Sequence, residues 1–259
     1  GVSLQPGELL CLAVALHLAK LLSRDAERDP LKSFVNTIIL VVLAVLPLLA
    51  QPDLGTTILI FTVSMGMYVE KIGWRYPVIA GGVLGGVIFP LLILIEPYRM
   101  RRVTAFLDPW QDPLNKGFQA IQGLIAFANG GLWGSGLGHG FQKLNYLPAA
   151  YTDFIYAAVG EELGLVGATI IMVMFALLII RGYWIAMHAR DRYSMLLAAG
   201  LTTLLALQVF LNVAVVTNLL PSTGISLPFF SSGGTALIMQ LAENGIVLNI
   251  SRSISQSPN

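Results

Sequence analysis

Long apolar runs, separated by short polar connectors, constrain this chain more than any other feature of its sequence. Four of them are long enough to cross a hydrocarbon core of roughly 30 Å as a helix: residues 34–50, 78–95, 154–180 and 195–220. Three shorter runs are residues 9–22, 54–69 and 235–250. With 56% hydrophobic and only 11% charged residues, the composition lies outside the range of soluble domains. The sequence predicts an all-α polytopic membrane protein with about seven transmembrane helices in one transmembrane domain, residues 1–259.

The few charges and the single cysteine exclude other classes of protein. A formal net charge of +1 argues against nucleic acid as a partner. Cys11 is the only cysteine, so the chain has no internal disulfide framework. The chain starts at Gly1 and runs into an apolar segment with no basic stretch before it. We expect further spans to precede this segment in the whole protein.

Lysine and arginine predict the orientation in the membrane, because connectors on the cytoplasmic side carry an excess of both. They gather in every second connector and in the tail: Lys20, Arg24, Arg28, Lys32, Lys71, Arg75, Arg181, Arg190, Arg192 and Arg252. That side is predicted to be cytoplasmic, and the C-terminus with it. Residues 96–152 then form a large extracytoplasmic loop.

This loop is much longer than a usual connection, and its sequence is typical of an ordered structure. Residues 118–127 have the apolar periodicity of a helix, and residues 129–140 are rich in glycine. The glycines lack the spacing of a dinucleotide-binding loop, so we interpret them as tight turns. The loop also carries five basic residues that are candidate ligands for an anion: Arg99, Arg101, Arg102, Lys116 and Lys143.

Isolated acids at the ends of apolar runs are the candidates for chemistry, because an ionisable group near membrane depth is costly. Asp153 ends the long loop just before an apolar run, and Asp53 follows Pro52 at another hinge. For each of these two acids, capping of the following helix is an equally good interpretation. The other acids within or beside apolar runs are Glu8, Glu161, Glu162 and Glu243.

Residues 220–234 are irregular yet largely apolar. Pro221, Pro228 and the glycines of this stretch forbid a plain helix, and the polar content is too low for a solvated loop. We predict a re-entrant segment that is buried against protein.

Several short motifs follow one another along nearly the whole chain. They are Gln5-Pro6-Gly7-Glu8, Gln51-Pro52-Asp53-Leu54-Gly55-Thr56, Tyr98-Arg99-Met100-Arg101-Arg102-Val103 with Leu107-Asp108-Pro109, Leu147-Pro148 with Thr152-Asp153-Phe154, Glu161-Glu162-Leu163-Gly164, and Leu220-Pro221-Ser222-Thr223-Gly224 with Leu227-Pro228 and Gly233-Gly234. In this order they resemble the SEDS (shape, elongation, division and sporulation) glycosyltransferases. Residues 101–110 and 248–252 are more similar to the division branch, FtsW, than to the elongation branch, RodA.

The resemblance implies ten transmembrane helices in the whole protein, of which this chain holds the fourth to the tenth. It implies a multi-pass protein of the bacterial cytoplasmic (inner) membrane that polymerises lipid II into glycan strands during cell division. The active site is then extracytoplasmic. The implied partners are lipid II, a class B penicillin-binding protein, other divisome proteins and membrane lipid.

The chemistry of that reaction fits a single carboxylate. An acceptor hydroxyl loses a proton as it attacks an anomeric carbon, and a positioned carboxylate accepts that proton. A lipid pyrophosphate leaves as an anion, so the reaction needs no general acid, unlike the paired carboxylates of glycosidases. Cationic side chains, with or without a divalent cation such as Mg²⁺ or Mn²⁺, stabilise the leaving group.

The resemblance assigns the general base to Asp153. It implies substrate binding for Arg99, Arg101, Arg102, Asp53, Glu8, Lys116 and Lys143. Asp53 and Arg101 or Arg102 are expected near Asp153 in one polar cavity. Glu161 and Glu162 lie about 12 to 14 Å further along a helix by its rise, and one of them is expected in a buried network. Cys11 replaces a lysine that is common in the family, which weakens the case for lipid-phosphate binding by the first helix.

Two other functions stay open at this point. A flippase or transporter of a lipid-linked precursor would also use broken helices, here at Pro52 and Pro221, together with buried acids. A noncatalytic scaffold that activates a penicillin-binding protein is the third class.

Overall fold

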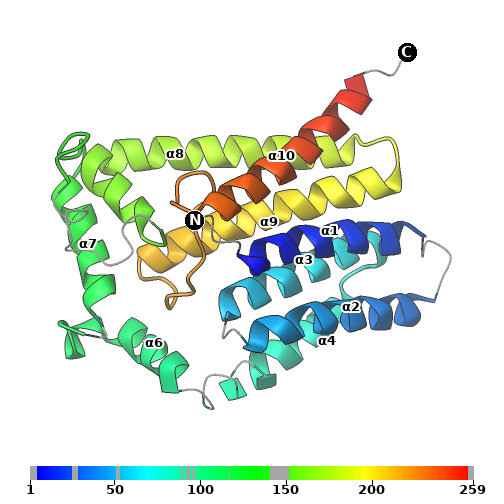
Figure 1. Cartoon of the computed structure of the whole chain (residues 1–259), viewed down its shortest axis with the longest axis horizontal. Coiled ribbons are helices and arrows are strands. Elements are labelled where there is room, and N and C mark those ends of the chain that lie inside the picture. The colour runs from blue at the N-terminus through cyan, green and yellow to red at the C-terminus, as the bar shows by residue number, and fades with distance from the viewer. Residues whose placement is uncertain are drawn as a thin grey trace. The chain divides into compact units, whose positions relative to one another are not determined.

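The computed structural model describes residues 5–24, 29–50, 53–88, 90–91, 94, 97–115, 117–140 and 152–255. Every regular element in these ranges is a helix (Figure 1), which confirms the predicted all-α class. The helices are α1 Pro6–Arg24, α2 Pro30–Ala50, α3 Leu54–Ile72, α4 Arg75–Val83, α6 Pro97–Leu107, α7 Phe118–Gly130, α8 Ile155–Met187, α9 Arg192–Val216 and α10 Gly234–Ser255. A π-helical stretch covers Leu84–Ile88 and a 3-10 turn covers Pro109–Gln111.

The helices agree with the apolar runs of the sequence. Of the described helices, α1, α2, α8 and α9 are long and apolar enough to cross a membrane, and shorter apolar helices cover Leu54–Val69 and Arg75–Ile88. The chain is therefore a multi-pass membrane protein, while the total of seven spans stays a prediction. Within residues 96–152, the expected helical stretch 118–127 is confirmed by α7.

The chain divides into two compact units, each described here by itself. The first unit comprises Gly1–Gly81, Leu177–Leu207 and Gly233–Asn259, and the second comprises Gly82–Ala176 and Gln208–Ser232. Helices α8 and α9 contribute one part to each unit.

In the first unit, α1, α2 and α3 pack against one another and α1 also contacts α10. The Tyr68 hydroxyl of α3 donates a hydrogen bond to the Pro30 carbonyl at the start of α2, at 2.9 Å. The Tyr68 ring meets the Phe34 ring edge-on at 5.3 Å. These contacts fix where α2 begins relative to α3.

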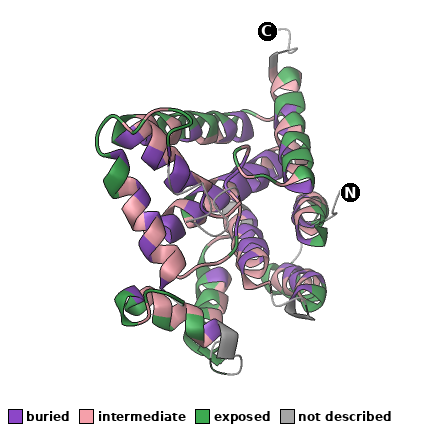
Figure 2. Cartoon of the chain, turned by 60° about the vertical axis from the view of Figure 1, so that its left-hand side comes forward, coloured by how far each residue is buried: buried purple, intermediate pink, exposed green. Residues whose placement is uncertain are grey.

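Helix α10 belongs to the first unit and buries one stripe. Its buried residues, three and four positions apart, include Ala236, Gln240, Glu243, Val247 and Ile250. That spacing keeps them on one helix face. Figure 2 shows buried and exposed surfaces alternating along the helix that ends at the C-terminus. Glu243 thus lies on the packed side of its helix.

The core of the second unit surrounds the start of α8. Phe154, Tyr156 and Ala157 are buried together with residues of α7 and of the end of α9. A Cβ built on Gly123 of α7 would lie 3.1 Å from the Phe154 ring. Phe154 is therefore fixed in the core, directly beside Asp153.

Helix α8 is interrupted at Gly164, which the prediction of one continuous span over residues 154–180 missed. Gly164 has φ 67° and ψ −170°, a conformation that is essentially restricted to glycine. The first segment, residues 155–163, turns away from the long one in Figure 1. The 23 residues from 165 to 187 rise about 34 Å, enough to span a hydrocarbon core.

Helix α9 ends at Val216, although the apolar run predicted helix as far as Leu220. Asn218 takes a positive φ of 56°, and the Leu219 amide donates to the Ala214 carbonyl at 2.7 Å. Asparagine in the left-handed region after a helix is a common way to end it. The described residues between α9 and α10 contain no helix or strand, which confirms the predicted irregular segment. Its depth in the membrane stays a prediction.

Candidate active site

The turn before α8 is held through its backbone carbonyls. The Thr152 carbonyl accepts a hydrogen bond from Ser231 Oγ at 2.6 Å. The Asp153 carbonyl accepts one from Asn212 Nδ2 at 2.8 Å. The next carbonyl, of Phe154, accepts from the Ala157 amide at 3.0 Å as the helix begins. The backbone of this turn is thus fixed on both sides of Asp153.

The Asp153 carboxylate accepts a hydrogen bond from the Thr152 side chain and lies beside the irregular segment. A Cβ built on Gly224 would lie 3.8 Å from its Oδ2. Burial raises the pKa of the Asp153 carboxyl above its ordinary value, while the Arg102 guanidinium and a hydrogen bond from the Thr152 side chain oppose that rise.

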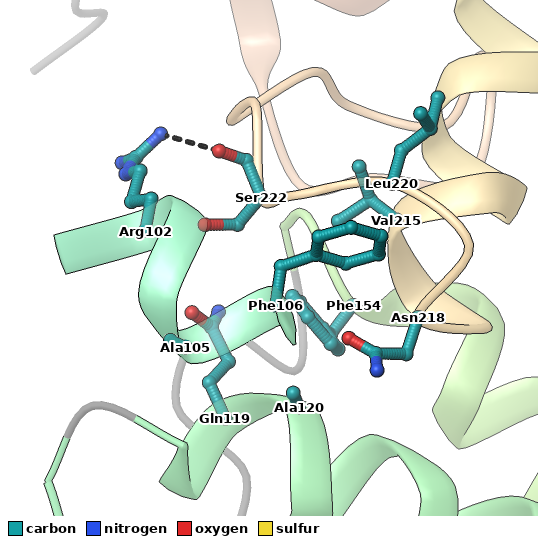
Figure 3. Close-up of a pocket in the computed structure, with 10 residues that line it drawn as sticks. All are labelled: Arg102, Ala105, Phe106, Gln119, Ala120, Phe154, Val215, Asn218, Leu220 and Ser222. Carbon is teal, nitrogen blue, oxygen red and sulfur yellow. Dashed lines mark hydrogen bonds between the residues drawn. The ribbon is translucent and has the colours of Figure 1, made fainter. Parts of the chain in front are cut away.

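Helix α6 brings Arg102 to the same irregular segment. Arg102 Nη1 donates to the Ser222 carbonyl at 2.8 Å, as Figure 3 shows. Beside this bond lies a cavity of about 40 Å³ that Phe106 and Phe154 help to line. A cavity of this size holds only a few water molecules. It is therefore a small packing cavity beside the site, too small to bind a sugar.

The other predicted basic residues differ in environment. Arg99 of α6 is buried, whereas Arg101 is exposed. Lys116 and Lys143 lie outside the described residues. Arg102 therefore lies near Asp153, whereas the side chain of Arg101 lies on the surface of the structure.

Asp53 and Glu8 lie in the first unit. Asp53 caps α3, since its Oδ1 accepts from the Thr56 amide at 3.0 Å and its Oδ2 accepts from Thr56 Oγ1 at 2.7 Å. A Cβ built on Gly7, next to Glu8, would lie 3.5 Å from Asp53 Oδ2. That Asp53 shares a cavity with Asp153 stays a prediction.

Glu161 and Glu162 stand at the break in α8. The Glu161 carbonyl accepts from the Ser135 amide and the Glu162 carbonyl from the Gly136 amide, both at 3.0 Å. Glu162 Oε2 also accepts from the Gly138 amide at 3.2 Å. On the other side of the break, the amides of Leu165 and Val166 donate to the carbonyls of Gly131 and Leu132, at 2.9 and 3.2 Å. The glycine-rich run thus supplies the backbone partners that the interrupted helix lacks.

Two residues of these arrangements were not singled out from the sequence, Asn212 and Ser231, which hold the Asp153 turn. Glu243, a candidate acid without an assigned role, is buried in the stripe of α10. Asn212 is one of three side-chain amides inside a long apolar run, with Gln208 and Asn218, and the sequence does not distinguish it from them. Among the described residues, no group of three or more His, Cys, Asp or Glu side chains is arranged to hold a metal ion.

Comparison with known proteins identifies the family. A family model that covers FtsW, RodA and SpoVE and is described as "Cell cycle protein" matches residues 1–256. The chain belongs to this family. Membership confirms the resemblance that the ordered motifs indicated, across nearly the whole chain.

Individual relatives agree with this assignment. The chain is 43% identical over 263 residues to the "Probable peptidoglycan glycosyltransferase FtsW" of Geobacter sulfurreducens, covering all of this chain and 70% of that protein. It is 43% identical over 253 residues to "Stage V sporulation protein E" of Bacillus subtilis, covering 96% of this chain and 69% of that protein. The name of the first relative confirms the predicted enzyme class.

Solved structures share the fold. One, described as "Structural coordination of polymerization and crosslinking by a peptidoglycan synthase complex", has a TM-score of 0.78 and 30% identity, covering 98% of this chain and 71% of that one. The rod shape determining protein RodA of Thermus thermophilus has a TM-score of 0.68 and 26% identity, covering 98% of this chain and 67% of that one.

Proposed function

We propose that this chain is the catalytic part of a peptidoglycan glycosyltransferase that polymerises lipid II during cell division, with Asp153 as the general base. The observation that carries the proposal is the partly buried carboxylate of Asp153, in a turn whose backbone carbonyls are held by hydrogen bonds from Asn212 and Ser231. A second support is the peptidoglycan glycosyltransferase name of the relatives.

The reaction uses Asp153 in one proton transfer. The acceptor hydroxyl of one sugar gives its proton to the Asp153 carboxylate as its oxygen bonds to the anomeric carbon of the other sugar. The bond from that carbon to the lipid pyrophosphate breaks, and the pyrophosphate leaves with the electron pair. A raised carboxyl pKa brings the base closer to the working pH, which favours proton transfer.

The pyrophosphate leaving group calls for positive charge, and α6 supplies candidates. Arg102 lies near Asp153 and Arg101 is exposed one residue earlier, so both are candidates to meet the departing phosphates. Guanidinium groups bind phosphate oxygens in a two-pronged geometry that an ammonium group does not offer. A divalent cation such as Mg²⁺ or Mn²⁺ at the pyrophosphate stays a prediction from the chemistry of the leaving group.

The proposed orientation places the Asp153 turn on the extracytoplasmic side and the C-terminus in the cytoplasm. It rests on the basic residues of alternate connectors. The proposed partner is a class B penicillin-binding protein, in line with the similarity to a structure of a peptidoglycan synthase complex.

The test is the variant Asp153→Asn in the full-length protein, purified with its partner. Loss of a general base lowers the rate by roughly 10²- to 10⁴-fold, so lipid II polymer on a gel should fall by at least that lower factor. Undiminished polymer would contradict the proposal. If Asp153→Asn loses polymerisation but still binds its partner, the protein is not a pure scaffold. If the same variant still moves lipid II across the membrane of vesicles at the unchanged rate, polymerisation is separate from transport.

A further inference from the structure

The side chain of Asn212 joins the turn that carries Asp153 to the irregular segment that lies beside the Asp153 carboxylate. Its Nδ2 donates to the Asp153 carbonyl and to the Ile225 carbonyl, both at 2.8 Å. Both partners are carbonyl oxygens, so the contacting atom must be the amide nitrogen, and its two hydrogens are both used. Asn212 is 1% exposed.

The burial of Asn212 is costly and therefore informative. Within the described residues its Oδ1 is buried and has no hydrogen-bond partner. An unsatisfied buried oxygen opposes folding, and an apolar side chain of similar size would avoid that cost. The amide at this position is explained by what its nitrogen holds.

Ser231 makes a second connection between the same two segments. Its Oγ donates to the Thr152 carbonyl at 2.6 Å and accepts from the Leu227 amide at 2.8 Å. Consecutive carbonyls of the Asp153 turn are thus tied to the irregular segment, one by Ser231 directly and one through Asn212.

The irregular segment also contacts Arg102 and lies beside the carboxylate. Ser222 accepts the bond from Arg102, Gly224 lies beside Asp153 Oδ2, and Ile225 accepts the bond from Asn212. These positions follow one another in the chain within four residues. A displacement of residues 222–225 would therefore move Arg102 and Gly224 together relative to the Asp153 carboxylate.

We propose that Asn212 and Ser231 are positioning residues, which hold the Asp153 carboxylate and residues 222–225 in register so that base and Arg102 face one reacting centre. This inference rests on the proposed function. Neither residue touches the reacting atoms; both act through the backbone of the turn.

The experiment compares Asn212→Ala, Ser231→Ala and Ser231→Thr in the full-length protein with its partner, measuring kcat and KM for lipid II per folded enzyme across pH. Misplacement of a catalytic group by about 1 Å lowers rates by about 10²-fold. We expect kcat to fall by about 10²-fold for Asn212→Ala and by about tenfold for Ser231→Ala. The KM of both variants should stay within about threefold of the value for the unchanged protein. Ser231→Thr keeps the hydroxyl and should retain most of the activity.

Thr202→Val is the matched control, because Thr202 is buried on the same helix but its hydroxyl donates to the Ala198 carbonyl of that same helix. It should lose stability without loss of kcat per folded enzyme. The acid limb of the rate should move for Asn212→Ala, since the surroundings of Asp153 change, and stay in place for Thr202→Val. Asn212→Ala with an unchanged kcat and an unmoved limb would overturn the inference. If Asp153→Asn polymerises normally, the proposed function itself fails, whatever the Asn212 variants do.

Discussion

Asp53 and Asp153 occupy similar positions in the sequence, but their carboxylates have different hydrogen-bond partners and different proposed roles. Each is a lone acid just before an apolar helix. Asp53 uses both carboxylate oxygens on Thr56, so it is a helix cap. Asp153 is held by its carbonyl, and its carboxylate lies beside Gly224 and near Arg102.

A structural acid and a candidate base differ in what holds the carboxylate in place. A cap fixes the carboxylate by consuming its lone pairs, which leaves few of them for a substrate. At Asp153 the fixing is done by Asn212 and Ser231 through the main chain. The Asp153 carboxylate accepts a hydrogen bond from the Thr152 side chain, while its backbone position is set by the bonds to its turn.

The largest expected effect comes from substituting asparagine for each acid. Asp153→Asn should lower polymerisation by at least about 10²-fold. Asp53→Asn should stay within about twofold, because asparagine caps helices as well as aspartate does. If Asp53→Asn also abolished polymerisation, Asp53 would contact the substrate, as the family resemblance implies, and the comparison would break.

Asp153 also predicts a dependence of stability on pH. The folded state raises the pKa of Asp153 and so binds its proton more tightly than the unfolded chain does. Stability from this group is therefore present below the unfolded pKa and is lost as pH rises through the folded pKa. Asp153→Asn should raise the midpoint of thermal unfolding in detergent at neutral pH. A lowered midpoint would show that the carboxylate is needed for folding.

The next effect concerns the charge that opposes the raised pKa of Asp153. Arg102→Gln removes that charge, so the pKa should rise further and the acid limb of the polymerisation rate should move to higher pH. At a pH on that limb we expect Arg102→Gln to polymerise more slowly than the unchanged protein. Arg101→Gln is the control, because Arg101 is exposed and does not shift the pKa of Asp153. An equal shift in both variants would contradict the assignment.

A smaller effect is expected at Gly224, which forms the wall beside Asp153. Its φ of 78° suits glycine, and an L-residue there costs roughly 1–2 kcal/mol. Gly224→Ala should lower the free energy of unfolding by about that amount and reduce polymerisation. Gly245→Ala is the control, since a Cβ at Gly245 meets no described atom within 4 Å. Its helical position should make that variant neutral or slightly stabilising.

The smallest effects are expected for the caps themselves. Asp53→Ala should cost about 1 kcal/mol of unfolding free energy. Asp191 caps α9 through the Ser194 amide and hydroxyl, and these bonds lower the pKa of Asp191. Its stabilisation is present above the unfolded pKa and is lost as pH falls through the folded pKa. Asp191→Ala, at an exposed cap, should cost less than Asp53→Ala at pH 7. A larger loss for Asp191→Ala would reverse this order.

The apolar runs predicted the helices well, because hydropathy over a whole segment dominates the structure of a membrane protein. They predicted neither the break at Gly164 nor the early end of α9. At Gly164 the cause lies in residues 131–136, whose backbone groups replace the missing helix bonds. In α9 it lies in a single left-handed asparagine, Asn218.

The candidate site divides in the same way. Asp153 and Arg102 were predicted from motif and charge. Asn212 was not, because its contact with Asp153 joins residues 59 positions apart. Periodicity carries no information about such a contact, and only the fold reveals which buried amide holds which carbonyl.

The interruption of α8 has a consequence for the order in which the chain is made. Residues 131–136 leave the ribosome before Gly164 does, so the partners of the broken helix already exist when the break is synthesised. The bond from Asn212 closes much later, after the rest of α8 and most of α9. The shape of α8 is thus available early in biogenesis, whereas the Asp153 turn gains its final hold only when the end of α9 has been added.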